Sequence, residues 1–155
     1  MKKFKYLTLF LLIISFKMAS AQIDTLSSDS LFNMARTAAF DQQNYPLAIS
    51  ISKKALAEAP DYTDVSIFLG RLYTWSNKTD SARRVFRKIL TKHPKDEDAS
   101  FAYGSLEYWN NNLSKALEVV NMGLKYHKES KDLLTLRAEI RADMKNNKAV
   151  KPKKK

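Results

Sequence analysis

The sequence predicts an all-α fold in which helix pairs stack side by side as a solenoid, and two observations carry this prediction. The chain matches itself at an offset of 34 residues, as at Ala48, Ala82 and Ala116, and a fixed period of about 20 to 50 residues is typical of solenoids. Apolar residues also recur at helical spacing, and the chain contains only three glycines. We therefore expect about three helix pairs followed by one capping helix.

Each predicted helix has its own local signals. The predicted ranges are 28–42, 46–58, 62–75, 79–92, 97–109, 113–126 and 131–145. Asp29, Asp61 and Asp96 place negative charge near helix N-termini, and Pro46 lies in a first turn where its missing N–H costs nothing. The last helix keeps an apolar stripe that includes Leu133 and Ile140, so it should cover the last repeat.

The repeated residues point to a family. Further matched positions are Leu56, Leu90 and Leu124; Ile51, Val85 and Val119; Pro60 and Pro94; Gly70 and Gly104; and Trp75 and Trp109. This pattern resembles the tetratricopeptide repeat (TPR) family over residues 28–146. The resemblance implies repeats at 29–62, 63–96 and 97–130, each made of two antiparallel helices, A and B, in a right-handed superhelix whose groove is lined mainly by A helices. Arg36 and Lys128 depart from the pattern by replacing a glycine and a proline.

Two segments carry a narrower resemblance. Residues 60–75, PDYTDVSIFLGRLYTW, and residues 106–116, LEYWNNNLSKA, resemble the periplasmic TPR portion that precedes the barrel in YaiO-type outer-membrane β-barrel proteins. No alternating strand pattern follows the repeats in this sequence. The sequence is that of a stand-alone or truncated relative, or of a TPR protein of similar ancestry, and barrel function is not transferred.

Residues 1–21 are typical of an export signal. Three lysines within the first five residues precede an apolar run at 6–16 and small residues at 19–21. The run is shorter than the roughly 20 residues needed to span a membrane, so we expect cleavage after residue 21 and a linker at 22–27. With no cysteine in the chain, neither disulfides nor lipidation are expected. The predicted location is the periplasm or the exterior, with association to the outer membrane through a partner.

The net charge of +11 is concentrated at the two ends of the chain. Four lysines precede residue 22 and six follow Asp143, and without these ten the 27 basic residues fall to 17 against 16 acidic ones. A nucleic-acid partner is therefore not predicted. The basic tail at 147–155 is expected to be disordered, either touching an anionic membrane surface or lipopolysaccharide or serving only as a solubilising end.

Residues on the inner side of the A helices form the predicted binding groove. They are Asn33, Thr37, Phe40, Asp64, Ile67, Arg71, Thr74, Trp75, Phe101, Ser105, Tyr108 and Trp109. Such a mixed aromatic and polar surface suits an envelope protein or peptide, with a glycan as the alternative partner. Trp75 and Trp109 could instead only fill the turn into the next helix. Arg71 could bind a carboxylate, although the Lys and Asn clamp pattern of chaperone-tail-binding TPRs is absent.

No residue constellation suggests catalysis, a cofactor or a metal site. The sequence lacks nucleophile-elbow, phosphate-loop and zinc motifs. His93 and His127 occupy equivalent positions at the ends of B helices, where helix capping explains them better than metal binding does. We therefore predict a non-catalytic scaffold without cofactors, with weak self-association to cover an exposed solenoid end.

Overall fold

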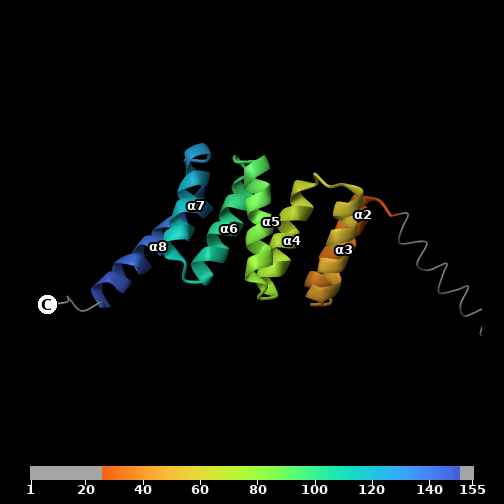
Figure 1. Ribbon diagram of the computed structural model, residues 1–155, viewed down its shortest axis with the longest axis horizontal. Coiled ribbons are helices and arrows are strands. Elements are labelled where there is room, and N and C mark those ends of the chain that lie inside the picture. The colour runs from red at the N-terminus through yellow and green to blue at the C-terminus, as the bar shows by residue number, and fades with distance from the viewer. Residues whose placement is uncertain (1–25, 151–155) are drawn as a thin grey trace, which may run out of the picture.

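The computed structural model describes residues 26–150, with side chains described up to 147, and this part of the chain forms a row of seven helices (Figure 1). The helices are α2 (Ser28–Phe40), α3 (Tyr45–Glu58), α4 (Thr63–Trp75), α5 (Thr79–Lys92), α6 (Glu97–Trp109), α7 (Leu113–Tyr126) and α8 (Lys131–Val150). The predicted signal peptide, most of the linker and residues 151–155 of the tail lie outside the described residues. None of the described helices is long and apolar enough to cross a membrane.

The helices pair as the 34-residue period predicts. The A helices α2, α4 and α6 each pack on the following B helix, α3, α5 and α7, and each pair contacts the next. The fold is the predicted all-α solenoid of helix pairs, and the first six helices agree with their predicted bounds to within two residues. The seventh helix was predicted too short, because α8 continues to Val150 through residues that were assigned to the tail. No proline or glycine interrupts residues 145–150, so nothing local stops the helix there.

The turn from each A helix to its B helix has one repeated conformation. Gln43, Asn77 and Asn111 lie 34 residues apart and have φ values of 50°, 56° and 57°. This left-handed conformation is most accessible to Asn among residues with a side chain. It lets the chain reverse in a few residues, so the A helix ends at the same level in each repeat.

Glycine is needed where an A helix touches its B helix. A Cβ atom on Gly70 would lie 2.6 Å from the Phe86 ring, and one on Gly104 would lie 2.6 Å from Cγ2 of Val120. In the first repeat the position equivalent to Phe86 is the smaller Ser52. The first repeat therefore tolerates Arg36, whose exposed guanidinium lies 5.9 Å from the centre of the Phe32 ring.

The capping helix buries the end of the last repeat, as predicted. Leu133, Leu136 and Ile140 of α8 are buried against Ala116 and Val120 of α7. The Tyr108 hydroxyl also donates a 2.8 Å hydrogen bond to Oδ2 of Asp143. This contact ties α6 directly to the capping helix.

Candidate functional site

Two hollows on the A-helix side meet at Arg71, and together we call them the groove. The first has a volume of about 290 Å³ and lies between α2 and α4, with Asp98 of α6 at its edge. The second has a volume of about 230 Å³ and lies between the end of α4 and α6. The first is lined by Phe32, Arg36, Phe40, Asp64, Ile67, Phe68, Arg71 and Asp98. The second is lined by Arg71, Thr74, Trp75, Phe101, Ala102, Ser105 and Trp109.

Most of the predicted site residues are brought together in these hollows. Phe40, Asp64, Ile67 and Arg71 line the first, although Ile67 is almost wholly buried. The predicted residues of the second hollow are Arg71, Thr74, Trp75, Phe101, Ser105 and Trp109. That any of them binds a partner stays a prediction.

Three predicted site residues line neither hollow. Asn33 and Thr37 are exposed on α2 but are not among the lining residues. Tyr108 is turned toward α8, where its hydrogen bond to Asp143 raises the pKa of the tyrosine hydroxyl. The sequence places Tyr108 on the inner side of α6, but the repeat pattern does not show that the capping helix supplies a partner for it.

Sequence reasoning missed five lining residues of the groove, namely Phe32, Arg36, Phe68, Asp98 and Ala102. Phe68 and Ala102 occupy equivalent positions in successive repeats. A comparison of the repeats could have found Phe68 and Ala102. A phenyl ring in one repeat corresponds to a methyl group in the next, and such a loss of side-chain volume indicates a hollow.

Trp75, in the second repeat, lies within a cluster of aromatic rings. Its ring centre is 5.9 Å from that of Phe40, 5.9 Å from that of Tyr45 and 6.4 Å from that of Phe68. The indole is 39 % exposed. This is the packing role that the alternative interpretation of the tryptophans expects.

One repeat later, around Trp109, small side chains occupy the positions of these three rings. The positions equivalent to Phe40, Tyr45 and Phe68 are Thr74, Thr79 and Ala102. Trp109 is 66 % exposed and has no ring contact within the described part of the chain. Two of these small residues, Thr74 and Ala102, line the second hollow.

Arg71 supplies a positive charge at the junction of the two hollows. Its Nη2 atom lies 3.8 Å from Oδ1 of Asp98, and the side chain is partly exposed. At this distance the contact is longer than a hydrogen bond, so the guanidinium donors remain available to a ligand.

Both histidines are C-caps of B helices, and the backbone N–H of each donates to the carbonyl four residues earlier. The backbone N–H of His93 donates to the Ile89 carbonyl at 2.7 Å. His127 places Nε2 2.5 Å from the Lys95 carbonyl oxygen and Nδ1 3.2 Å from Oε2 of Glu97. The His127 ring therefore ties the end of α7 to the turn before α6. Within the described residues no group of three or more His, Cys, Asp or Glu could hold a metal ion.

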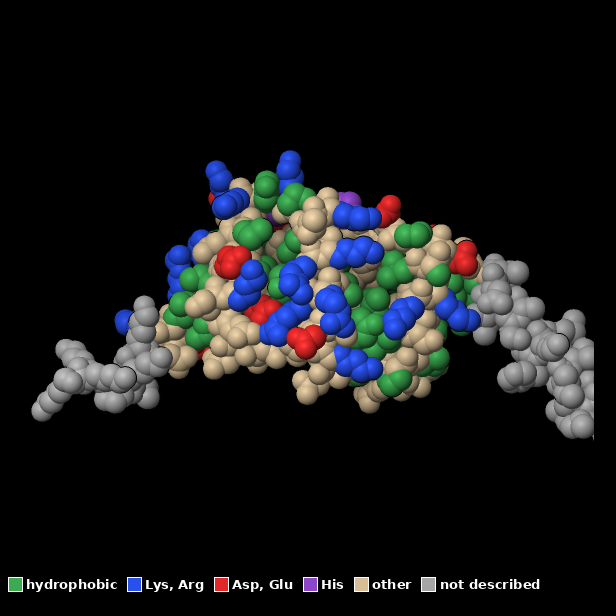
Figure 2. Space-filling model, viewed as in Figure 1, with side chains coloured by type: hydrophobic (Ala, Val, Ile, Leu, Met, Phe, Trp, Pro, Cys, Tyr) green, Lys and Arg blue, Asp and Glu red, His purple; other side chains and the backbone are tan. Residues whose placement is uncertain are grey.

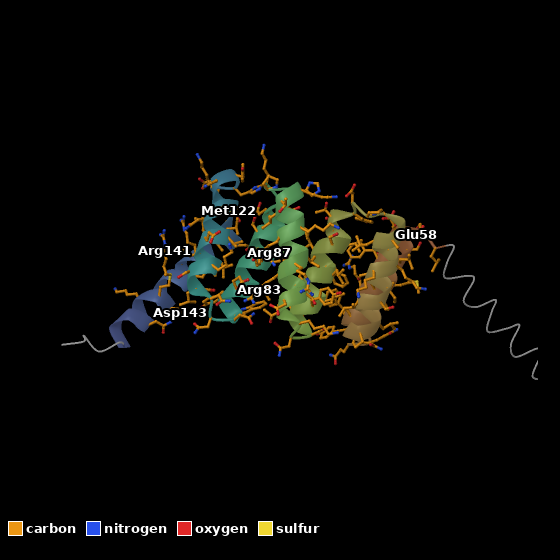
Figure 3. The ribbon with its side chains drawn as sticks, viewed as in Figure 1. Glu58, Arg83, Arg87, Met122, Arg141 and Asp143 are labelled. Carbon is orange, nitrogen blue, oxygen red and sulfur yellow. The ribbon has the colours of Figure 1, made fainter. Side chains whose placement is uncertain are left out.

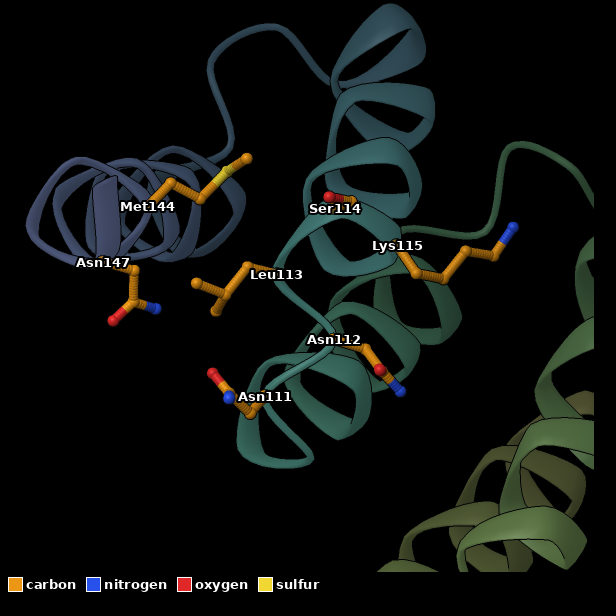
Figure 4. A pocket seen from close by; sticks show the side chains of 7 residues that line it. All are labelled: Asn111, Asn112, Leu113, Ser114, Lys115, Met144 and Asn147. Carbon is orange, nitrogen blue, oxygen red and sulfur yellow. The ribbon is translucent and has the colours of Figure 1, made fainter. Parts of the chain in front are cut away.

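A third hollow lies at the C-terminal end of the solenoid. It has a volume of about 490 Å³ and lies between the α6–α7 turn and the second half of α8 (Figure 4). Its lining residues are Asn111, Asn112, Leu113, Ser114, Lys115, Met144 and Asn147. The lining is mostly polar and the hollow is widely open, so it offers a ligand little apolar surface.

Comparisons with known proteins agree with this architecture. The TPR domain of Sgt2 from Aspergillus fumigatus is similar with a TM-score of 0.72 and 19 % identity, covering 83 % of this chain and 86 % of that one. The first TPR of Spaghetti (RPAP3), bound to an HSP90 peptide, has a TM-score of 0.69 and 14 % identity, with coverages of 76 % and 95 %. A TPR protein from Parabacteroides merdae has a TM-score of 0.68 and 20 % identity, with coverages of 77 % and 47 %.

Sequence comparisons give the family. No curated protein matches the chain significantly. The family model for the tetratricopeptide repeat matches residues 39–89 and 76–140, which is more than half of the chain. The chain therefore belongs to the tetratricopeptide repeat family.

Proposed function

We propose that this protein is a non-catalytic scaffold of the bacterial envelope that binds a peptide or protein partner in the groove. The observation that carries the proposal is the second hollow, in which the exposed Trp109 stands beside Thr74 and Ala102. An exposed indole at the edge of an apolar hollow can bury a large area when a partner side chain enters.

The surroundings of Trp75 indicate what kind of side chain fits the second hollow. Phe40 lies against Trp75, and one repeat later the equivalent residue, Thr74, lines the hollow beside Trp109. A partner that inserts an aromatic or large aliphatic side chain there would restore the missing contact with the indole. The Arg71 guanidinium, next to the hollow, would donate to a carbonyl or carboxylate of the same partner.

The structural neighbours support a peptide as the ligand. One of them, the first TPR of Spaghetti (RPAP3), is bound to the HSP90 peptide SRMEEVD. At 14 % identity this likeness concerns the fold alone. It supports the proposal that a groove of this shape takes an extended peptide, while the chemistry of the anchor must come from the residues of this chain.

The envelope location rests on the N-terminal pattern of basic, apolar and small residues, which lies outside the described residues. If the chain is exported, the mature protein begins at Gln22. Mass spectrometry of the protein from a periplasmic fraction checks this, and a mass that includes residues 1–21 would contradict it.

A matched pair of substitutions tests the groove. Peptides are first selected on the purified protein from a random display library, and their affinities are then measured by fluorescence anisotropy. Thr74→Phe puts a ring into the second hollow, and Thr91→Phe puts one on the outer face of α5. Both threonines donate their hydroxyl to the carbonyl four residues earlier, at 3.0 Å and 2.8 Å, so the two variants lose the same local hydrogen bond.

We expect the selected peptides to share a bulky apolar residue and to bind Thr74→Phe at least about 30-fold more weakly, because filling the hollow removes a central anchor site. Thr91→Phe should bind as the wild type does. Equal affinity of the peptides for wild type and Thr74→Phe would exclude the second hollow as the anchor site.

A carbohydrate partner is the second candidate, favoured by the exposure of Trp109. A flat, solvent-facing indole can stack on the apolar face of a sugar ring. Tyr108, which was part of this hypothesis, is engaged by Asp143, so Trp109 and Trp75 would carry the binding. Binding to envelope polysaccharide that survives high salt and is lost in Trp109→Ala would support this candidate over a peptide.

A further inference from the structure

Among the six helices of the three repeats, the B helices carry most of the positive charge. Together α3, α5 and α7 contain nine Lys and Arg against three Asp and Glu, whereas α2, α4 and α6 contain two against five. The B helices lie toward the viewer in Figure 1, and Figure 2 shows Lys and Arg side chains spread over this face. The nearly neutral body predicted from the sequence therefore consists of two faces of opposite sign.

Several cations of the B-helix face already have carboxylate partners. Arg83 pairs with Asp80 and Glu107, Lys92 pairs with Asp61, and Lys115 pairs with Glu118. These pairs neutralise part of the face. They involve two of the three carboxylates on the B helices, Asp80 and Glu118. Glu58, the third, lies in the last turn of α3 (Figure 3).

Four exposed cations of α3 and α5 have no carboxylate within 4.0 Å among the described residues, and we call them the unpaired set: Lys53, Arg84, Arg87 and Lys88. Arg84 donates to the Ser81 hydroxyl at 3.1 Å, and Nε of Arg87 lies 3.4 Å from the Arg83 carbonyl oxygen. These contacts leave other guanidinium donors of both residues directed to solvent.

The unpaired set extends over two neighbouring repeats rather than along one helix. Lys53 of α3 and Arg87 of α5 are one period apart, so they occupy the same outward position in successive repeats. Exposed apolar side chains flank the set on the same face, Leu47 on α3 and Met122 on α7. The face thus combines a two-dimensional group of cations with apolar side chains on both sides.

We propose that the B-helix face docks on an anionic lipid bilayer. The unpaired set would contact headgroup phosphates, and Leu47 and Met122 would enter the boundary between headgroups and acyl chains. Cations near an anionic bilayer are attracted to it, and partly buried apolar side chains add to the binding. A planar partner meets both helices at once, whereas a linear polyanion meets only a row of cations and gives the apolar side chains nothing to bury.

This orientation leaves the groove accessible. The groove is lined by A helices, which lie behind the B helices in Figure 1. A protein that docks through its B helices would present Trp75 and Trp109 to the aqueous side. The inference is independent of what the groove binds.

The test compares two variants of the full chain with the same loss of charge. The face variant combines Lys53→Gln, Arg84→Gln, Arg87→Gln and Lys88→Gln. The control variant combines Lys128→Gln, Lys131→Gln, Arg141→Gln and Lys145→Gln, at exposed positions of α8 and the turn before it. Gln keeps helix propensity, and circular dichroism checks that both variants fold. The apolar run at 6–16 is present in all three proteins, so its contribution cancels in the comparison.

Binding is measured by cosedimentation with vesicles of phosphatidylcholine and phosphatidylglycerol in equal parts, and with vesicles of phosphatidylcholine alone. Each cation at an anionic surface is worth about fivefold in partitioning, so the face variant should lose about a hundredfold or more on anionic vesicles. The control variant should lose much less. Equal losses in the two variants would mean that net charge alone causes binding, and would overturn the proposal.

Two further measurements identify the docking face and the class of partner. Tryptophan emission should not shift when anionic vesicles are added, because both tryptophans line the groove. A blue shift would mean that the groove side meets the membrane, and would overturn the proposal. Binding to polyglutamate or duplex DNA that is lost in the face variant, with vesicle binding unchanged, would reassign the face to a soluble polyanion.

Discussion

Arg83 of α5 and Glu107 of α6 form a bidentate ion pair that joins the second repeat to the third. Nε of Arg83 lies 2.7 Å from Oε1 of Glu107, and Nη2 lies 2.8 Å from Oε2. Glu107 is only 1 % exposed, and Nδ2 of Asn112 donates a third hydrogen bond to it at 2.8 Å. Burial opposes the charged form of Glu107, but the hydrogen bonds from Arg83 and Asn112 outweigh it and lower the pKa of the carboxyl.

Removing the Glu107 charge should destabilise the protein strongly. Glu107→Gln leaves Arg83 without its main partner, and breaking a buried ion pair from one side costs about 3 to 5 kcal/mol. We expect a loss in the free energy of unfolding of about 3 kcal/mol, measured by urea denaturation, because Arg83 remains partly exposed. The control is Glu118→Gln, which breaks the exposed pair with Lys115 and should cost less than about 1 kcal/mol. Equal losses would contradict the buried role of Glu107.

The same pair makes stability depend on pH in the acid range. The folded state lowers the pKa of Glu107, so the contribution of its charge is fully present above the unfolded pKa of about 4.3 and is lost as pH falls through the lower folded pKa. The difference in free energy of unfolding between wild type and Glu107→Gln should therefore shrink toward acid pH. Urea denaturation over a pH series measures it, and a constant difference would show that the carboxylate charge contributes nothing.

Gly104 should tolerate no larger side chain without loss of stability. The methyl group of Gly104→Ala would lie 2.6 Å from Cγ2 of Val120 and 3.3 Å from Cδ2 of Leu136. Overpacking of this kind costs about 1 to 3 kcal/mol. The double variant with Val120→Ala removes the nearest clashing atom, so the two substitutions should not be additive in thermal or urea unfolding. Additive losses would mean that the two helices do not meet as closely as described.

The two tryptophans should differ in their effect on stability, although they occupy equivalent positions. Trp75→Ala removes three ring contacts and should cost about 2 kcal/mol. Trp109→Ala removes a mostly exposed indole and should cost about 0.5 kcal/mol or less. Urea unfolding of the two variants tests this, and equal losses would show that Trp109 is also a packing residue.

The helices were predictable because the period and the local signals agree. Small residues at Ala48, Ala82 and Ala116 fix the register of the helix pairs, and this register determines where the turns between the helices lie. The left-handed conformation of Asn77 and Asn111 was not predicted, although the sequence shows Asn at this position in two successive repeats. The periodicity of apolar residues predicts helices and their buried faces, but it does not predict the backbone conformation of a turn.

The groove was predicted in outline because inner positions of A helices recur with the same period. Arg71, Trp75 and Trp109 were found in this way. Tyr108 was also assigned to the groove, but it lines neither hollow and donates a hydrogen bond to Asp143 of α8, a helix that lies outside the repeat pattern. The positive charge of the B-helix face was also not predicted. A net charge summed over the whole chain does not show that the A helices and the B helices differ in charge.

The second hollow also indicates how a repeat protein can acquire a site. Each helix pair contacts only the neighbouring pairs, and the third pair also contacts the capping helix. The side chains of one copy can therefore be small while the other copies keep the array folded. Trp109 occupies the position of Trp75, while Thr74, Thr79 and Ala102 occupy the positions of the three rings that surround Trp75. In a repeat protein, a binding surface can thus arise through loss of side-chain volume in one repeat. The equivalent position in the neighbouring repeat stays filled and shows which side chain fits.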